Sequence, residues 1–206
     1  MNASDVESIV IAGGLGTRLG AAKKALLDVG GRPIVERVLD AVRPLGGDVI
    51  LVDNDDSLAY LDGVRIVPDT ETRAGVLTAL YSGLSAARSE LCVVVACDMP
   101  FVSFDVLRWL LDLAPDCDVV IPVTGGFMDP MHAIYRRGPC LAAIGSALAR
   151  GDKRMTSFLG DVCVREVSES ELRAHDPELR SLFNVNTPED LELARQIVAS
   201  HQSGAT

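Results

Sequence analysis

The residues best suited to chemistry near the start of the chain are three glycines and two cations. A short β-branched apolar run is followed by Gly13, Gly14 and Gly16, and then by Arg18 and Lys24. Closely spaced glycines let the backbone turn tightly and point several amide N–H groups at one anion. A guanidinium offers several donors in one plane and an ammonium adds a point charge, so both suit phosphate oxygens. The segment therefore predicts a phosphate-binding loop.

Two familiar phosphate-binding motifs do not fit this loop. A P-loop closes with Gly-Lys-Ser or Gly-Lys-Thr, which is missing here, and Gly14-x-Gly16 lacks the third glycine of a dinucleotide-binding loop. A plain glycine turn with solvated cations is the alternative interpretation. The position of Arg18 and Lys24 directly after a strand and its glycines favours phosphate binding.

A carboxylate follows the most apolar run of the chain. Cys97-Asp98-Met99-Pro100 comes directly after residues 91–96, whose sequence LCVVVA is typical of a central parallel strand. Mg²⁺ binds through one or two carboxylates plus substrate phosphates, and it steadies a pyrophosphate leaving group. The alternative is a strand-end aspartate in a turn that Pro100 supports. The glycine loop nearby favours Asp98 as a metal ligand.

The order of the predicted elements supplies a scaffold for these residues. Strands are expected at 8–12, 48–52, 64–67, 91–96, 119–123, 131–135 and 162–167. Helices are expected from Pro33, at 75–88, from the cap Ser103 to about Leu113, at 139–150 and from the cap Thr187. Strands that alternate with helices predict an α/β fold with three layers, α/β/α, around a mostly parallel Rossmann-like sheet. Ligands of such sheets bind beyond the carboxyl ends of the strands.

The composition agrees with this fold class and excludes others. Apolar residues make up 48% of the 206 residues and aromatic residues only 4%, which suits strands covered by helices on both faces. A net charge of -10 argues against a sequence-independent grip on nucleic acid. No apolar run approaches the roughly 18 residues of a membrane span, and no signal-peptide pattern is present. We expect a cytoplasmic protein with one domain over residues 1–199 and a disordered tail at 200–206.

The cysteines, histidines and remaining acidic runs are expected to be structural or solvated. Five cysteines have no paired metal-type spacing, and we expect free thiols (Cys92, Cys97, Cys117, Cys140 and Cys163). His132 lies in an apolar run and is expected to be a satisfied structural histidine. His175, His201 and the acidic run 168–171 are expected at the surface, and Trp109 in the core. No Ser or Cys nucleophile with a nearby base is recognisable.

The motifs together resemble a known family over residues 9 to about 197. The pattern G-G-x-G-x-R-x-G-x-x-x-K at 13–24 is similar to the signature of nucleotidyltransferases with the nucleotide-diphospho-sugar transferase, or glycosyltransferase-A-type, fold. Cys97-Asp98-Met99-Pro100 resembles the metal-binding motif of the molybdenum cofactor guanylyltransferase (MobA) family, within the MobA-like NTP transferases. Residues 184–191 resemble that family's N-V-N-T-P-E-D-L segment.

The resemblance implies transfer of GMP from GTP to the phosphate of molybdopterin, with release of pyrophosphate and with Mg²⁺ as cofactor. The product would be the molybdopterin guanine dinucleotide cofactor, passed on to molybdoenzymes or their chaperones. No nucleic acid or membrane partner is implied. Arg18, Lys24 and Asp98 would be catalytic, Asp98 and Asn186 would hold the metal, and Lys153, Arg154 and Asn184 would bind the acceptor. The nucleotide would contact Ala12, Gly13, Gly14, Leu15, Gly16, Thr17, Arg18, Lys24, Asp69, Gly75 and Asp98.

Departures from the family pattern lie on the base and acceptor sides. Val52 stands where members often carry Asn near the base, Val76 replaces a usual proline, Thr78-Ala79 replace Ala-Gly, and Asp129 stands where His is common. Two alternatives therefore remain open. One is the same transfer with CTP or another nucleotide, to molybdopterin or to a sugar-phosphate or isoprenoid-type acceptor. The other is a non-catalytic nucleotide-binding protein, against which the intact phosphate-side residues argue.

Overall fold

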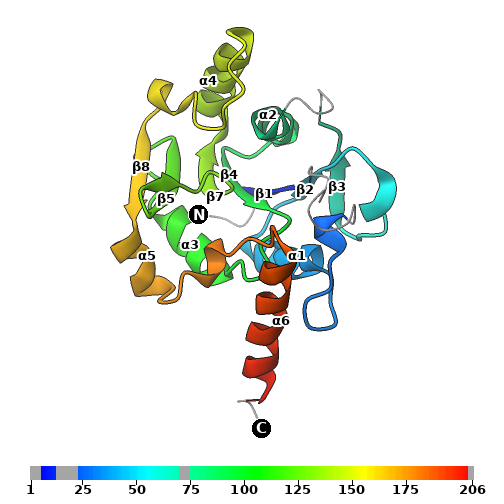
Figure 1. Ribbon diagram of the computed structural model, residues 1–206. Coiled ribbons are helices and arrows are strands. Elements are labelled where there is room, and N and C mark those ends of the chain that lie inside the picture. The colour runs from blue at the N-terminus through cyan, green and yellow to red at the C-terminus, as the bar shows by residue number, and fades with distance from the viewer. Residues whose placement is uncertain (1–5, 13–22, 70–74, 204–206) are drawn as a thin grey trace.

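A computed structural model describes residues 6–12, 23–69 and 75–203, the last three without their side chains. These residues form an eight-stranded sheet with the order β3-β2-β1-β4-β7-β5-β6, in which β8 pairs with β5 (Figure 1). The strands are β1 (Val6–Ile11), β2 (Val49–Val52), β3 (Val64–Val67), β4 (Leu91–Ala96), β5 (Val119–Thr124), β6 (Phe127–Met128), β7 (His132–Arg136) and β8 (Val164–Ser168).

The sheet is mostly parallel, as predicted. Strands β1, β2, β3 and β4 run parallel to one another, whereas β7 is antiparallel to both β4 and β5. Ile11 at the end of β1 is aligned with Val52 on one side and with Ala96 on the other. The chain segments that follow these three strands therefore leave the sheet side by side.

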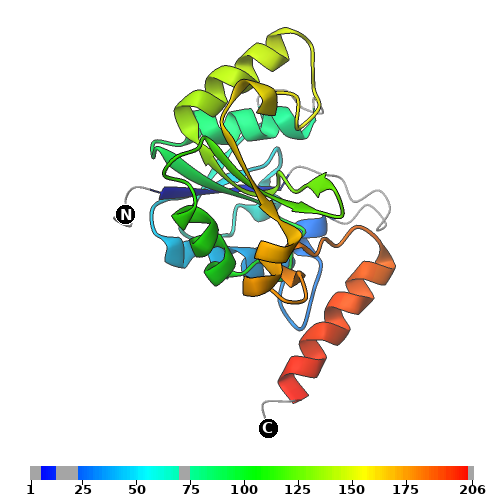
Figure 2. The ribbon, with the colours of Figure 1, turned by 90° about the vertical axis from the view of Figure 1, so that its left-hand side faces the viewer.

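Helices cover both faces of the sheet and complete the three layers (Figures 1 and 2). One face is covered by α2 and α4, and the other by α1, α3 and α5, with the first turns of α6. The helices are α1 (Ile34–Val42), α2 (Val76–Ala86), α3 (Phe104–Asp112), α4 (Arg137–Ala149), α5 (Glu169–His175) and α6 (Pro188–Ser203). Short 3-10 turns include η3 (Lys24–Leu26), η5 (Asp56–Leu58) and η7 (Arg180–Leu182). Each face has its own apolar core, built largely from Val, Leu, Ile and Ala.

Local capping explains where α5 and α6 begin. The Ser168 hydroxyl accepts a hydrogen bond from the Glu171 amide, and the Glu171 carboxylate accepts one from the Ser168 amide. The acidic run 168–171, predicted only as solvated surface, thus starts a helix that the sequence analysis did not predict. Thr187 accepts from the Asp190 amide at the start of α6. That helix continues to Ser203, so residues 200–203, predicted to belong to a disordered tail, are helical. No described helix has the length and hydropathy to span a bilayer.

Gly83 lets α2 approach β1 closely. A Cβ atom at this position would lie 2.5 Å from the Ile9 Cγ2 atom, whereas a Cβ at Gly138 in α4 would meet open space. We expect Gly83→Ala to lower the free energy of unfolding by about 1–3 kcal/mol through overpacking. The midpoint would fall by about 2–4 °C for each kcal/mol in a chain of this size. Thermal unfolding checks this, with Gly138→Ala as the control, which is expected to keep or raise the midpoint because alanine is the better helix former. Equal midpoints for the wild-type chain and Gly83→Ala would contradict the packing.

Candidate active site

The carboxyl ends of β1 and β4 carry two oppositely charged side chains that meet. Lys24 begins η3, where the chain returns after the glycine segment, and Asp98 lies two residues beyond β4. The Lys24 Nζ atom lies 2.9 Å from the Asp98 Oδ2 atom, and the two side chains are 19% and 16% exposed. The structure thus brings together two of the three residues predicted to be catalytic.

The segment before α6 completes this cluster. The Lys24 ammonium also donates to the Asn186 Oδ1 atom at 2.5 Å. The Val185 amide donates to the Asp98 backbone carbonyl at 2.9 Å, which ties this segment to the end of β4. The Asp190 carboxylate accepts from the Asn186 amide at 2.9 Å and holds the turn. Asp98 and Asn186, the two predicted metal ligands, therefore face the same cation.

This oxygen pair has the chemistry of a site for a hard divalent cation. Within the described residues no group of three or more His, Cys, Asp or Glu side chains gathers as a complete metal site. Mg²⁺ does not need one, since it uses one or two carboxylates together with substrate phosphates and water. In this structure the Lys24 ammonium binds the two oxygen atoms, of Asp98 and Asn186, that would hold the metal ion. The residues present fit a metal that substrate completes.

A pocket of about 220 Å³ opens at this cluster. Its described lining consists of the ends of β1 and β4 together with residues from four further segments: Ile11, Ala12, Lys24, Val76, Ala96, Cys97, Asp98, Met131 and Asn184. The Asn184 side-chain amide donates to the Leu182 carbonyl at 2.8 Å. Ala12 and Asn184, both predicted to contact substrates, thus lie on the pocket wall.

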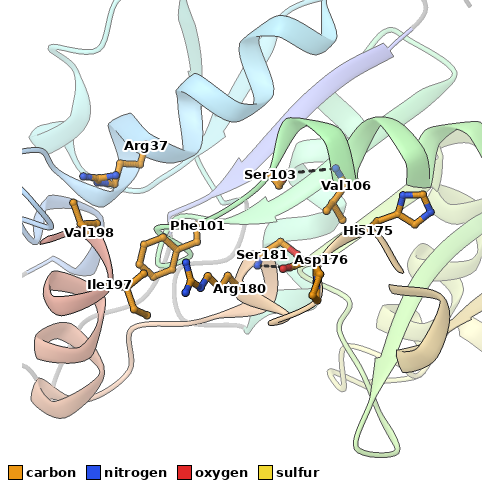
Figure 3. Close-up of a pocket in the computed structure, with 11 residues that line it drawn as sticks. Arg37, Phe101, Ser103, Val106, His175, Asp176, Arg180, Ser181, Ile197 and Val198 are labelled. Carbon is orange, nitrogen blue, oxygen red and sulfur yellow. Dashed lines mark hydrogen bonds between the residues drawn. The ribbon is translucent and has the colours of Figure 1, made fainter. Parts of the chain in front are cut away.

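A larger pocket of about 610 Å³ lies elsewhere, between α3, the end of α5 and α6 (Figure 3). It is lined by Arg37, Phe101, Ser103, Val106, His175, Asp176, Pro177, Arg180, Ser181, Ile197 and Val198. The Asp176 carboxylate is occupied by the Ser181 amide at 2.7 Å, and Arg37 donates to the Val29 carbonyl at 2.8 Å. None of the predicted site residues lines this pocket. We therefore place the chemistry in the smaller one, where the cation and carboxylate meet.

A second polar group lies at the start of α2. The Asp69 carboxylate accepts from the Thr78 hydroxyl at 3.3 Å and from the Ser82 hydroxyl at 3.4 Å, and the Asp69 amide donates to the Asn54 side chain at 2.8 Å. Gly75 caps α2 with a φ of 115°, a conformation that favours glycine. Two of the predicted nucleotide contacts, Asp69 and Gly75, are thus held near the start of α2.

The two valines predicted to affect base recognition differ in environment. Val52 is fully buried, and its Cγ2 atom would lie 3.1 Å from a Cβ at Gly83 under α2. Val52 is the last residue of β2, and its side chain faces the core beneath α2. Val76 is 42% exposed and lines the small pocket. Of the two valines, Val76 is the one that the small pocket has in its described lining.

Of the predicted acceptor residues, Asn184 lines the small pocket, whereas Lys153 and Arg154 do not. Lys153 and Arg154 are exposed, and Arg154 pairs with Asp152 at 2.8 Å. The Lys153 carbonyl lies 3.9 Å from the place of a Cβ at Gly75, so this turn borders the start of α2. Asp129 accepts from the Thr124 hydroxyl at 3.0 Å, and burial raises its pKa.

Other predicted site residues lie outside the described part of the chain. These are Gly13, Gly14, Leu15, Gly16, Thr17 and Arg18. Sequence reasoning also missed a cluster at the end of β2, where Lys23 binds Asp53 and Asp55. Asp53 follows β2 as Asp98 follows β4, and its side chain is buried. Its place directly after a strand was the available signal, but a run of aspartates there also resembles a solvated turn.

The cysteines match their prediction and His132 matches it only in part. All five thiols are free, and all but Cys163 are buried. His132 is fully buried, but neither ring nitrogen has a hydrogen-bond partner among the described residues. Burial lowers the pKa of His132 to about 4, although Asp176 opposes this shift. His175 is exposed, as predicted, and stacks on the half-buried Trp109 with ring centroids 4.0 Å apart.

The burial of His132 predicts a pH dependence of stability. An unfolded chain protonates this group near pH 6.5, whereas the folded chain does so near 4. Between these values the unfolded state binds more protons, so the free energy of unfolding falls as the pH falls. As the pH falls from 6.5 to 4, the free energy of unfolding of the wild-type chain is expected to fall by up to about 3 kcal/mol relative to that of His132→Leu, at about 1.4 kcal/mol per pKa unit. Urea unfolding of both chains at pH 7, 5.5 and 4 measures the difference; a difference independent of pH would contradict it.

Comparisons with known proteins identify the family of the chain. The family model of the MobA-like NTP transferase domain matches residues 8–168. A probable molybdenum cofactor guanylyltransferase of Pelotomaculum thermopropionicum is 34% identical and 95% of each chain is covered. A molybdenum cofactor guanylyltransferase of Desulfosudis oleivorans is also 34% identical, with 94% of this chain and 96% of the relative covered.

Solved structures show the same fold. The molybdopterin-guanine dinucleotide biosynthesis protein A of Archaeoglobus fulgidus superposes with a TM-score of 0.81 at 28% identity, covering 94% of this chain and 99% of its own. A nucleotidyl transferase of Methanothermobacter reaches a TM-score of 0.74 at 21% identity, which supports the fold alone. The chain belongs to the MobA-like NTP transferase family and is a nucleotidyltransferase.

Proposed function

We propose that this protein transfers GMP from GTP to the phosphate of molybdopterin and releases pyrophosphate, forming the molybdopterin guanine dinucleotide cofactor. The observation that carries the proposal is the meeting of Lys24, Asp98 and Asn186 at the carboxyl ends of β1 and β4. Relatives that cover nearly the whole chain bear the name molybdenum cofactor guanylyltransferase, which supports this choice of nucleotide and acceptor.

The proposed step is an in-line substitution at the α-phosphorus of the nucleotide. An oxygen of the acceptor phosphate forms the new P–O bond, the bond from the α-phosphorus to the bridging oxygen breaks, and pyrophosphate leaves with the electron pair. The acceptor phosphate is already an anion at neutral pH, so no general base is needed. Positioning and charge neutralisation supply the rate enhancement.

Some of the described residues would hold the metal ion and others would bind the phosphate groups of the nucleotide. Asp98 and Asn186 would hold Mg²⁺, which when bound neutralises charge on the α-phosphate and on the leaving pyrophosphate. The Lys24 ammonium has three donors, of which Asp98 and Asn186 take two. Its remaining donor, and those released when Asp98 turns to the metal, would hold phosphate oxygens. Arg18 would add a second cation for the same oxygens.

The acceptor would approach past the start of α2. Lys153 and Arg154 are exposed cations on a turn that borders Gly75, and Asn184 lies on the wall of the small pocket. Because Arg154 is paired with Asp152, the acceptor phosphate would have to compete with this exposed carboxylate. Such an exposed pair is weak and easily exchanged.

The exposure of Val76 on the wall of the small pocket favours keeping a second candidate function, the same transfer with CTP or another nucleotide. An exposed valine offers the base an apolar contact without hydrogen bonds. A base held by few hydrogen bonds is discriminated weakly.

Thermal unfolding with Mg²⁺ and each of GTP, CTP, ATP and UTP in turn tests the choice of nucleotide. A ligand that binds only the folded chain raises the midpoint by mass action, so GTP is expected to give the largest shift. Pyrophosphate release with GTP and molybdopterin then tests the transfer. A larger shift and turnover with another nucleotide would establish the second candidate. No shift with any nucleotide would contradict both.

A further inference from the structure

Two adjacent lysines at the end of the glycine segment point to opposite sides of β1. Lys23 has an extended backbone, with φ of −66° and ψ of 121°, and successive side chains of an extended segment point in opposite directions. In the sheet, β1 lies between β2 and β4. Lys24 accordingly reaches the carboxylate beyond β4, and Lys23 reaches the carboxylates beyond β2.

The ammonium group of Lys23 is fully engaged. It contacts the Asp53 carboxylate, the Asp55 carboxylate at 2.9 Å and the Ser57 hydroxyl at 2.9 Å. A lysine has three ammonium donors, so these partners account for all of them. The Asp53 side chain is only 3% exposed and that of Lys23 is 13% exposed. Lys23 is therefore held by protein groups at the border between the buried Asp53 and Asp55, whose side chain is 58% exposed.

We propose that Lys23 is a positioning residue, which fastens the returning end of the glycine segment to the carboxyl end of β2 and so aims Lys24 at Asp98. Ala25, on the other side of Lys24, is fully buried in the core. The backbone at Lys24 is thus fixed on both sides, by the ion pairs of Lys23 before it and by the burial of Ala25 after it. The inference rests on the proposed role of Lys24 in nucleotidyl transfer.

The competing possibility is that Lys23 binds substrate phosphate directly. Its three donors are taken by Asp53, Asp55 and Ser57, whereas Lys24 has two partners, Asp98 and Asn186, among the described residues. A phosphate at Lys23 would also meet two carboxylates, one of them buried. Like charges at such separations repel, so this side of β1 disfavours an anion.

A double-mutant cycle between Lys23 and Lys24 separates the two possibilities. Lys23→Met alone leaves the buried Asp53 carboxylate without its cation, which destabilises the fold. The working variant is therefore Lys23→Met with Asp53→Asn, and Arg150→Gln at an exposed ion pair is the control. With Mg²⁺ and the nucleotide that the wild-type chain uses, we expect this double variant to lose about tenfold in kcat/KM, chiefly in kcat, as misdirection of Lys24 requires.

The same two substitutions made in a chain that also carries Lys24→Met show whether the loss in kcat/KM arises through Lys24. If Lys23 acts through Lys24, adding the double variant there costs less than about twofold more, because coupled residues are not additive. Full additivity would show direct phosphate binding and overturn the inference. Wild-type kcat and KM in the double variant would also overturn it. An equal fall in the folded fraction and in kcat, with KM unchanged, would show a merely structural role.

A measurement without substrate keeps this test apart from the proposed function. Hydrogen bonds from the Ser57 side chain and from Lys23 lower the pKa of Asp55 to about 2. Carboxyl-carbon NMR titration of the nucleotide-free chain is expected to show this pKa rising in the Lys23→Met, Asp53→Asn variant. An unchanged pKa would mean that Lys23 is not fastened there in solution and would overturn the inference. Failure of the wild-type chain to bind any nucleotide would instead contradict the proposed function alone.

Discussion

Asp98→Asn is expected to lower kcat for pyrophosphate release by about a thousandfold while the protein stays folded. Asparagine keeps the shape of the side chain and an oxygen that can accept from Lys24, whose Nζ lies 2.9 Å away. It removes the negative charge that a divalent cation requires of this ligand. The lost interaction is one that stabilises developing charge on the leaving pyrophosphate, so the loss falls on kcat.

The fold is expected to tolerate this change because Asp98 is held to the neighbouring segment by a hydrogen bond of its backbone. The Asp98 carbonyl accepts from the Val185 amide, a bond that substitution of the side chain leaves in place. Asp112→Asn at an exposed position of α3 is the matched control, since it makes the same change in a carboxylate whose partner among the described residues is Arg108 at 3.7 Å. Initial rates at saturating nucleotide across a Mg²⁺ titration give the answer. A kcat for Asp98→Asn within tenfold of the Asp112→Asn value would contradict the assignment.

Most of the fold was predictable because strongly patterned segments determine it. The predicted strands at 64–67 and 91–96 agree with β3 and β4 to the residue, and the caps Ser103 and Thr187 start α3 and α6 as expected. An uninterrupted apolar run can be satisfied only by burial on both faces of a sheet. These segments therefore leave the chain few alternatives.

The direction of β7 was not predictable by the same reasoning. Hydrophobic periodicity identifies a strand but carries no information on which neighbour it joins or in which sense. Here β7 inserts between β4 and β5 and runs antiparallel to both. The two-residue strand β6 is too short to show any period, and the helix α5 depends on a capping box rather than on an apolar stripe.

The site was predictable where function depends on strand ends and unpredictable where it depends on side-chain direction. Asp98 lies just beyond β4, which pairs with β1, and Lys24 stands on the segment that follows β1, so their meeting at 2.9 Å agrees with the topology. The opposite directions of the Lys23 and Lys24 side chains could not be predicted from two adjacent lysines, because they depend on the backbone angles at Lys23. Val52 shows the same limit, since the pleat of β2 turns its side chain to the core.

Lys24→Met is the second change with a large expected effect, and its signature differs from that of Asp98→Asn. Loss of a cation that meets phosphate oxygens in the transition state is expected to lower kcat by about 10²–10³-fold. Apparent Mg²⁺ affinity should be retained or improved, because the ammonium that competes for Asp98 and Asn186 is gone. Asp98→Asn, in contrast, should weaken the response to Mg²⁺.

Lys24→Arg provides the matched control for charge. It keeps a cation at the same place but replaces a compact point charge with a wider planar fork, so partial activity between wild type and Lys24→Met is expected. Steady-state rates over a grid of Mg²⁺ and nucleotide concentrations measure both kcat and the apparent Mg²⁺ affinity of each variant. If Lys24→Met instead raised the Mg²⁺ requirement with kcat unchanged, the ammonium would serve only to hold Asp98 and Asn186 in place. Its assignment to the phosphates would then be wrong, because a lysine that acts on the leaving group must change the rate at saturating metal.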